Sequence, residues 1–444
     1  MRIIRDISEA RATVLRRKPI GSGETPPAIL ERLREAFGRE MTPEEAVDII
    51  LEDVRMGGDT AIREYSFRLD GQRLASLEVP KSEIEAAPAK LEPELLAAMT
   101  LAAERIRDFH VRQVPQDWFD TRHGLVGQVF RPLDRVGIYV PGGTAAYPST
   151  VLMTAIPARV AGVREVVVAT PPRYAGPPVL AAAALAGVDR LFTIGGAQAI
   201  AALAYGTETV PKVDKIVGPG GIFVLLAKKK VYGQVDVDCL AGPTETLILA
   251  DESANPACCA ADLLAQAEHD PLASAILITN SPELAQKVSL EVERQIALLS
   301  RRDTAAQSLE RNGGIVLVES LVQGLDLANE YAPEHLCLMV RDPWSLLGQV
   351  RNAGAVFLGE ASHETLGDYV AGPSHVMPTS GSARFASPLV VRDFIKEISV
   401  IALSSEASRE LEGAARTIAL AEGLEGHARA VEARWAQRKD EASP

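Results

Sequence analysis

Apolar and polar positions divide the chain into a helical first quarter and a longer part with a different pattern. Up to about Val114, apolar residues recur at intervals of three and four, as in 42–70, where Thr42 is followed three residues later by Glu45. This spacing places the apolar side chains on one face of a helix, and the Thr-Glu pair is a capping box. The pattern therefore predicts that the first quarter is mostly helix.

From Val136 onward, apolar residues gather in short runs of the kind that buried strands have. The first series of runs alternates with Ala-rich helical stretches, and it lies at 136–140, 165–170, 190–194 and 214–218. The second series lies at 245–250, 274–279, 314–318, 335–340 and 355–359. A helix is predicted at 257–270, after the first run of the second series. Strands that alternate with helices form βαβ units, so we expect two α/β layers with parallel sheets.

After Pro388 the strand signals thin out, and 409–439 reads as amphipathic helix interrupted by a Gly-Leu-Glu-Gly break. We therefore expect an α/β protein with two Rossmann-like domains, parallel-rich sheets and small helical appendages at both ends. The expected divisions are a helical extension at 1–30, one α/β domain at 31–135 with 245–388, a second at 136–244, and a helical carboxyl-terminal unit at 389–444.

Charge and composition exclude several classes of protein. The 46 Lys and Arg against 59 Asp and Glu leave a net charge of −13, which disfavours binding to nucleic acid or to an anionic membrane. Every apolar run is far shorter than the roughly 20 residues that a membrane-spanning helix needs. The segment 1–18 is basic, but it contains acidic residues and has no apolar stretch of the kind that a secretion signal carries, which predicts a cytoplasmic protein.

The four cysteines include no C-x-x-C pair, which indicates reduced thiols and not a disulfide framework or a thiolate metal site. A metal, if present, is therefore expected among His, Asp, Glu and Gln side chains.

Glycine and proline gather after three strands of the first series, although an intact G-x-G-x-x-G fingerprint does not occur. The loops are YVPGGTAAYPS at 139–149, IGGAQAIAALAYG at 194–206 and VGPGGIF at 217–223. Glycine lets backbone amides and a helix start approach an anionic ligand, so the three loops could line one cleft at the carboxyl edge of the sheet. For any single loop, ordinary turn chemistry is the stronger interpretation.

Four groups of polar residues could take part in chemistry. Asp262, Gln266 and His269 share one stripe of the predicted helix, where Gln266 and His269 form half of a possible metal site, or else a solvated edge. Glu334 and His335 stand side by side before a strand, where adjacent residues diverge. This favours two separate tasks, such as general base and water-activating carboxylate, although a Glu-His pair taken alone is more often ordinary surface.

The other two groups lie in loops. Asp368 and His375 fall in 362–385, a polar, Gly- and Pro-rich segment that is either functional or a solvated connector. Glu422 and His427 flank a Gly-containing turn, where helix capping is the simpler interpretation.

Six long phrases together resemble the histidinol dehydrogenase family in order and spacing. They lie at 135–163, 195–220, 262–271, 329–336, 367–381 and 421–428. The resemblance implies a zinc-dependent, NAD-linked dehydrogenase with one zinc ion per subunit. It implies that L-histidinol, a small amino alcohol, is oxidised through an aldehyde to L-histidine with two NAD. It also implies a homodimer whose sites are shared between subunits.

The resemblance assigns roles residue by residue. The implied zinc ligands, which also face substrate, are Gln266, His269, Asp368 and His427. The implied catalytic residues are Glu334 and His335, and the further substrate-contacting positions are Thr244, His375 and Glu422, together with His335. The implied NAD-contacting positions are Tyr139, Gln198 and Gly221.

Two departures from the family pattern leave an alternative substrate open. Gly221 stands where the family has Asn, which predicts the loss of a hydrogen bond to the cofactor, and Thr244 adds a methyl group where the family has Ser. A paralogue that oxidises another small alcohol, such as sulfopropanediol, is therefore the alternative enzyme.

An alternative from another class is a two-lobed solute-binding or regulatory protein with a structural metal. Such a protein would bind its ligand without reducing NAD. The missing export signal argues against its periplasmic form, and Glu334 and His335 would have no task in it.

Overall fold

The computed structural model describes residues 1–17, 25, 27–122, 124–142 and 146–441. Contacts within the chain separate two units: unit 1 is Met1–Val114 with Leu133–Phe394, and unit 2 is Pro115–Pro132 with Ile395–Pro444. Residues 18–24 and 26 of the expected extension, and 143–145 of the first glycine loop, lie outside the described residues.

Unit 1 contains a six-stranded sheet, sheet A, in which every neighbouring pair is parallel. Its order is β1 (Ile3–Ile4), β11 (Gly314–Leu317), β10 (Ser274–Thr279), β9 (Glu245–Ala250), β12 (His335–Met339) and β13 (Ala355–Leu358). All residues of β9, β10, β11 and β12 are buried, as their continuous apolar runs predicted. The second predicted series of strands is confirmed, and β1 adds an edge strand that the sequence did not indicate.

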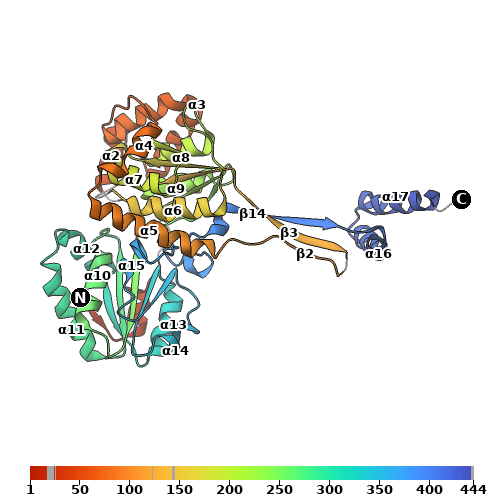
Figure 1. The fold of residues 1–444 in the computed structure, drawn as a ribbon. Helices are drawn as coiled ribbons and strands as arrows, with labels where there is room; N and C mark the ends of the chain where they lie inside the picture. Colours follow the sequence, from red (N-terminus) through yellow and green to blue (C-terminus); the bar gives the residue numbers. More distant parts are fainter. Residues whose placement is uncertain (18–24, 26, 123, 143–145, 442–444) are drawn as a thin grey trace. The chain divides into compact units, whose positions relative to one another are not determined.

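A second parallel sheet, sheet B, also belongs to unit 1. Its order is β6 (Arg190–Thr193), β5 (Glu165–Thr170), β4 (Arg135–Tyr139), β7 (Lys215–Val217) and β8 (Asp236–Val237). The first predicted series is thus confirmed, with β8 as an addition. Two parallel sheets with helices between their strands confirm the expected α/β class (Figure 1).

The helices of unit 1 fall into an early group and two groups that follow the sheets. The early group is α1 (Ile7–Ala12), α2 (Pro27–Phe37), α3 (Pro43–Asp70), α4 (Lys81–Ala86) and α5 (Pro93–Val111). The helices between the strands of sheet B are α6 (Pro148–Ala161), α7 (Pro177–Leu185), α8 (Gly196–Tyr205) and α9 (Ile222–Val231). Those of sheet A are α10 (Pro256–Ala267), α11 (Pro282–Ile296), α12 (Arg302–Asn312), α13 (Leu321–Tyr331), α14 (Trp344–Leu347) and α15 (Glu364–Tyr369).

Helix α3 begins as the sequence predicted. The Thr42 hydroxyl accepts from the Glu45 amide and the Glu45 carboxylate accepts from the Thr42 amide, which is a complete capping box. Ile50 and Ile62 of α3 share a buried core with Leu203 of α8, so this helix packs beside sheet B. We expected 31–135 to pair with 245–388; the division into units does not test those boundaries, but the core places α3 with sheet B.

Unit 2 holds a three-stranded antiparallel sheet and two helices. The strands, in sheet order, are β14 (Ile395–Ala402), β3 (Leu125–Pro132) and β2 (Trp118–Asp120), and the helices are α16 (Ser405–Ala421) and α17 (Glu425–Glu441). The two helices and the break between them confirm the interrupted helix predicted at 409–439. The strand β14 was not predicted, because most of its residues are exposed and its partner β3 lies far earlier in the chain.

All four cysteines are free thiols, as expected from their spacing. Among the described residues, no helix combines the length and the apolar character needed to cross a bilayer.

Candidate active site

The predicted catalytic pair lies at the amino edge of sheet A, where β9 and β12 are neighbours. His335 is the first residue of β12 and lies opposite Thr246 of β9. The chain steps from β9 to β10 and β11 on one side and then returns to β12 on the other side of β9. Ligands of open α/β sheets usually bind at the carboxyl edge of such a reversal, so the amino edge is an unusual place for this pair.

Glu334 is buried and held by two donors. Its Oε2 accepts from the Thr244 hydroxyl at 2.6 Å and from the Glu245 amide at 2.9 Å. Burial outweighs these hydrogen bonds and the nearby His335, and it raises the pKa of Glu334 to about 7. A carboxyl group with that pKa can both accept and release a proton near neutral pH.

His335 is buried as well, and both of its ring nitrogens face polar groups. Its Nδ1 lies 3.0 Å from the Glu245 carbonyl and 2.9 Å from the Gln266 side-chain amide, and its Nε2 lies 3.5 Å from Asp368 Oδ1. Burial alone would lower the pKa of His335, but the carboxylates of Glu364, Glu334 and Asp368 raise it to about 10. Nε2 has no hydrogen-bond partner among the described residues, so it is the nitrogen available to a ligand.

Three of the residues with a predicted ligand role come together beside His335. Gln266 lies on α10, with its amide nitrogen toward His335, and Asp368 lies on α15. Burial lowers the pKa of His269, although Asp368 opposes this, so the imidazole is neutral near pH 7. Burial would raise the pKa of Asp368, but the contact with His335 and the charges of the neighbouring histidines lower it.

These protonation states suit a divalent ion of borderline softness. A metal ligand must offer a free lone pair, and a neutral imidazole, a carboxylate and an amide oxygen together are donors that zinc accepts. Gln266, His269 and Asp368 could therefore hold such an ion. Among the described residues, no group of three or more His, Cys, Asp or Glu is gathered at one point.

Two further predicted residues adjoin the same site. The His375 Nδ1 faces the Asp368 carbonyl at 2.9 Å, and its Nε2 lies 3.3 Å from the Thr150 hydroxyl of α6. Burial lowers the pKa of His375 although Asp368 raises it. Thr244, expected near the substrate, turns its hydroxyl to Glu334.

The predicted NAD-contacting residues lie at the carboxyl edge of sheet B, where the glycine loops were expected. The Tyr139 hydroxyl, at the end of β4, accepts from the Gly196 amide at 3.1 Å and so connects two of the loops. Burial raises the pKa of Tyr139 to about 12, which keeps its proton available for donation. Neither side-chain polar atom of buried Gln198 has a partner among the described residues, which suits a ligand that brings its own donors and acceptors.

The third loop is fixed by a buried ion pair. Lys228 of α9 donates to the Gly218 carbonyl at 3.0 Å and pairs with Asp238, while the Gly218 amide donates to Asp238 at 2.7 Å. A Cβ at Gly218 would lie 2.2 Å from the Tyr139 carbonyl oxygen. Only glycine therefore allows the loop to approach β4 this closely. At Gly221 a Cβ would meet nothing within 4 Å, which leaves open space where the cofactor is expected.

Sequence reasoning missed this pair, because Lys228 lies in a run of three lysines and only the fold brings Asp238 to it. Its apolar neighbours on α9 were the available signal. Glu364 was also missed: this buried carboxylate, on the loop singled out for Asp368, accepts from Thr246 and from the Cys337 thiol.

Glu422 and His427, the remaining predicted residues, belong to unit 2. Glu422 caps α16 and His427 lies in the first turn of α17, and both side chains are exposed.

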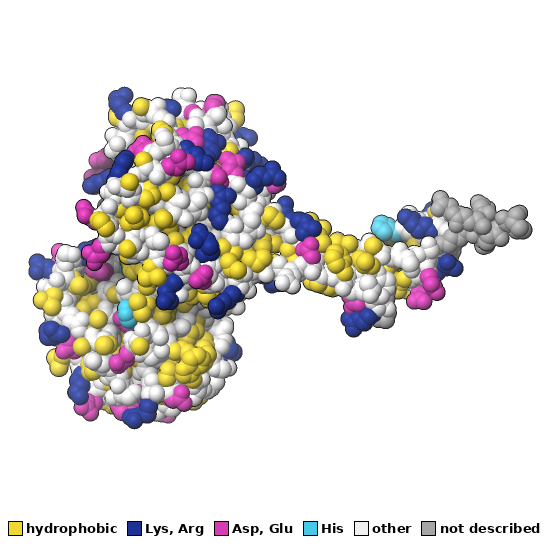
Figure 2. All heavy atoms as spheres, in the orientation of Figure 1, with side chains coloured by type: hydrophobic (Ala, Val, Ile, Leu, Met, Phe, Trp, Pro, Cys, Tyr) yellow, Lys and Arg dark blue, Asp and Glu magenta, His cyan; other side chains and the backbone are white. Residues whose placement is uncertain are grey.

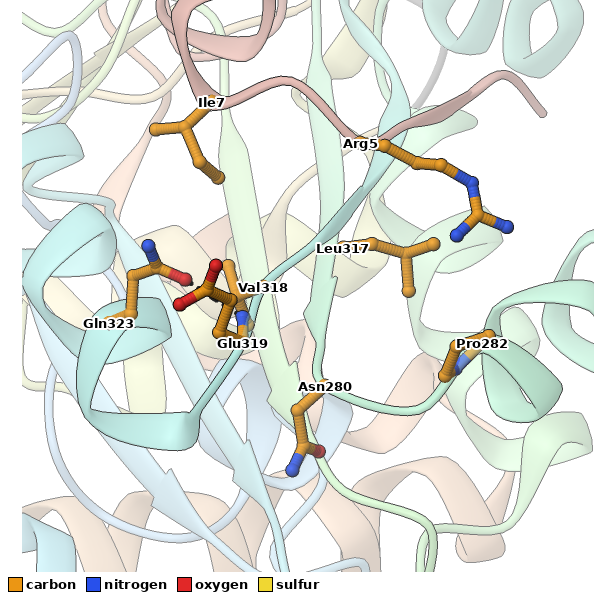
Figure 3. A pocket seen from close by; sticks show the side chains of 8 residues that line it. All are labelled: Arg5, Ile7, Asn280, Pro282, Leu317, Val318, Glu319 and Gln323. Atoms are coloured by element: carbon orange, nitrogen blue, oxygen red, sulfur yellow. Dashed lines mark hydrogen bonds between the residues drawn. The ribbon is translucent and has the colours of Figure 1, made fainter.

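A cavity of about 220 Å³ lies at the opposite, carboxyl edge of sheet A (Figure 3). Its lining residues are Arg5, Ile7, Asn280, Pro282, Leu317, Val318, Glu319 and Gln323. None of them is a predicted site residue, so the cavity is separate from the catalytic pair.

Comparison with known proteins covers both units. A family model described as histidinol dehydrogenase matches residues 34–435. A histidinol dehydrogenase of Deinococcus radiodurans is 55% identical over 435 residues, which are 96% of this chain and 98% of the relative. One of Dehalococcoides mccartyi is 51% identical over 436 residues, which are 97% of this chain and 99% of the relative. The crystal structure of the histidinol dehydrogenase of Elizabethkingia anophelis has a TM-score of 0.89 at 34% identity, and the match covers 98% of each chain.

Proposed function

Because the chain belongs to the histidinol dehydrogenase family, we propose that it oxidises the amino alcohol L-histidinol through the aldehyde to L-histidine, with one zinc ion per subunit and two NAD. The chain is thus an oxidoreductase of histidine biosynthesis, and a cytoplasmic location suits that role. The observation that supports the proposal most directly is the buried pair Glu334 and His335 beside Gln266, His269 and Asp368.

The zinc site is proposed from three residues of unit 1, namely Gln266, His269 and Asp368, with His427 of unit 2 as the fourth ligand. When bound, zinc would polarise the oxygen that loses its proton, and NAD would accept the hydride. The four ligands would be one carboxylate and three neutral donors, so the zinc site would keep a net positive charge. Such a charge favours the binding of an anionic oxygen.

His335 is the proposed base for the alcohol. Its Nε2 lacks a partner among the described residues and can take the hydroxyl proton, while the Glu245 carbonyl and the Gln266 amide fix the ring from the other side. The carboxylates of Glu364, Glu334 and Asp368 raise the pKa of His335 to about 10 and so favour the imidazolium. A zinc ion held by Asp368 would oppose these carboxylates and favour the neutral imidazole that a base must be.

Glu334 is the proposed partner for the second oxidation. With its pKa raised to about 7, its carboxylate can take a proton from water as the water adds to the aldehyde. Once His335 has released the first proton to solvent, it takes the proton of the hydrate, and the second NAD would accept the hydride. Retaining the aldehyde between the two steps keeps a reactive carbonyl out of solution.

Substrate contacts are proposed at Thr244, His375 and Glu422, together with the four zinc ligands and His335. The carboxylate of Glu422 offers a partner for the substrate ammonium. NAD contacts are proposed at Tyr139, Gln198 and Gly221, supported by the unpartnered amide of Gln198 and the open space at Gly221.

A homodimer with shared sites is proposed for the assembly. Unit 2 exposes large apolar side chains on its strands, Trp118, Phe119, Val126, Ile398 and Ile401, at 41% to 74% of their surface (Figure 2). The strand register places Trp118, Val126 and Ile401 on one face of this sheet and Phe119 and Ile398 on the other. A three-stranded sheet with two helices can bury little of this apolar surface by itself, and exposed apolar surface of this kind is typical of an interface.

The deciding experiment counts NADH formed per substrate consumed. Two NADH per L-histidinol are expected, with the rate lost on exhaustive chelation and restored by zinc. One NADH per molecule of another small alcohol, with no reaction of histidinol, would favour the paralogue. Binding of a ligand without any NADH would favour the solute-binding alternative.

A further inference from the structure

The segment that leads into the catalytic pair has an unfavourable backbone. Ala332 follows α13 with φ 52 and ψ 66, the left-handed region, and it is not a glycine. Pro333 explains why the helix cannot continue here, since the residue before proline avoids the helical region. A side chain in the left-handed region is strained, so contacts from elsewhere in the chain must hold this turn.

Arg17 supplies those contacts. Its Nε donates to the Tyr331 carbonyl at 2.7 Å and its Nη2 donates to the Ala332 carbonyl at 2.9 Å. Its guanidinium also lies 3.4 Å from the centre of the Tyr331 ring. A cation placed on the last carbonyls of α13 suits the negative end of the helix dipole.

The same guanidinium binds the neighbouring strand. Its Nη1 pairs with the buried carboxylate of Glu245, which also accepts from the Ser380 amide at 3.0 Å. The backbone of Glu245 touches both catalytic residues, because its amide donates to Glu334 at 2.9 Å and its carbonyl lies 3.0 Å from His335 Nδ1. Arg17 thus holds the turn before the pair and the strand beside it.

We propose that Arg17 is a positioning residue for Glu334 and His335, which fixes the 331–332 turn and the side chain of Glu245 so that both catalytic groups keep their orientation. This inference rests on the proposed oxidation of histidinol. Among the described residues, no hydrogen bond or ion pair joins Arg17 to Glu334 or His335 themselves, so it acts through the turn and Glu245. Its planar fork with several donors meets three acceptors at once, which a lysine ammonium cannot reproduce.

The test compares Arg17→Met and Arg17→Lys with a matched control. Arg11→Met is the control, because Arg11 also ties the amino-terminal segment to α13, through an exposed ion pair with Glu330, but does not reach the 331–332 turn.

We expect Arg17→Met to lower kcat by roughly 10- to 100-fold, since small displacements of catalytic groups cost that much. KM for histidinol and zinc content should stay within about twofold, because Arg17 faces neither. Arg17→Lys should recover part of kcat, and Arg11→Met should match the unmodified enzyme.

Hydrogen exchange of peptides that cover 331–336 gives a reading that needs no activity. Exchange should rise in Arg17→Met and not in Arg11→Met. If Arg17→Met does not fold, kcat and hydrogen exchange of Arg17→Lys are compared with those of Arg11→Met instead.

Equal kcat and equal exchange in the Arg17 and Arg11 variants would overturn the inference. A rise in KM with unchanged kcat would also overturn it, because it would place Arg17 in substrate binding. An unmodified enzyme without histidinol oxidation would defeat the proposed function instead, while the exchange comparison would still test whether Arg17 holds the turn.

Discussion

His335 lies among three carboxylates, with one ring nitrogen tied to the backbone of β9 and the other facing the site. We expect His335→Asn to reduce turnover by roughly 10²- to 10⁴-fold, the usual loss for a general base. Zinc content should stay close to that of the unmodified enzyme, because His335 is not among the proposed ligands. Initial rates of NADH formation and metal analysis check both points, and a fully active variant would remove His335 from its role.

Gly221 offers the opposite experiment, in which the substitution adds a side chain. The position has an ordinary φ of −69°, is the N-cap just before α9, and leaves open space beside it, so an asparagine fits without strain. We expect Gly221→Asn to lower KM for NAD by about 3- to 10-fold, as one added hydrogen bond would. Gly221→Ala fills the same space without a donor and should leave KM unchanged. Equal values for the two variants would remove position 221 from the NAD site.

At the scale of elements, α10 carries a buried acid that the proposed mechanism does not use. Burial, with Glu364 and Glu360, raises the pKa of Asp262 to about 7, and its Oδ2 has no partner among the described residues. The unfolded chain releases this proton near pH 4, so the folded protein holds a proton that the unfolded chain lacks between about pH 4 and 7. The contribution of this group to the free energy of unfolding is fully present at about pH 4 and is lost as pH rises to about 7.

Asp262→Asn should remove this loss. The variant is expected to resemble the unmodified protein at pH 4 and to exceed its free energy of unfolding at pH 8 by roughly 1–4 kcal/mol. Urea unfolding at several pH values measures the slope. Parallel curves for the two proteins would show that Asp262 does not titrate in this window.

The loop after β7 depends on the ion pair of Lys228 and Asp238. Lys228→Met leaves a buried carboxylate without its cation, which typically costs about 3–5 kcal/mol of stability. The same change frees the Gly218 carbonyl, so KM for NAD should rise as well. Lys229→Met, at the exposed neighbouring position, is the control and should change neither quantity. Urea unfolding and NAD titration provide the measurements, and a variant as stable as the control would contradict the assigned role of the pair.

The elements differ in how far the sequence could predict them. The strands of sheets A and B were predictable because continuous apolar runs such as 245–250 and 274–279 are buried on both faces. The strand β14 was not, since its pairing with β3 joins distant segments with little burial. In the site, Glu334 and His335 stood out by their motif. Arg17 and Lys228 did not, because their importance lies in carbonyls and carboxylates that only the fold brings to them.

At the scale of the whole molecule, the proposed zinc site draws on both units, and the proposed dimer would share it between subunits. We expect His427→Asn to lower zinc occupancy and activity. Mixing this variant with His335→Asn, by joint refolding, should restore about a quarter of full activity if subunits exchange at random, because half of the dimers would carry one intact site of two. No recovery would argue for a site built within one chain.

The free thiols of the chain have a practical consequence for such assembly studies. Burial raises the pKa of Cys239 and of Cys259 to about 12, and it also raises the pKa of Cys258 and Cys337. At neutral pH these sulfurs are almost entirely protonated and react slowly with alkylating reagents. A single cysteine engineered at an exposed position of α16 would therefore accept a spin label or fluorophore in preference to the buried Cys259 and Cys337. With the partly exposed Cys258 replaced, distances between labels on paired copies could be measured.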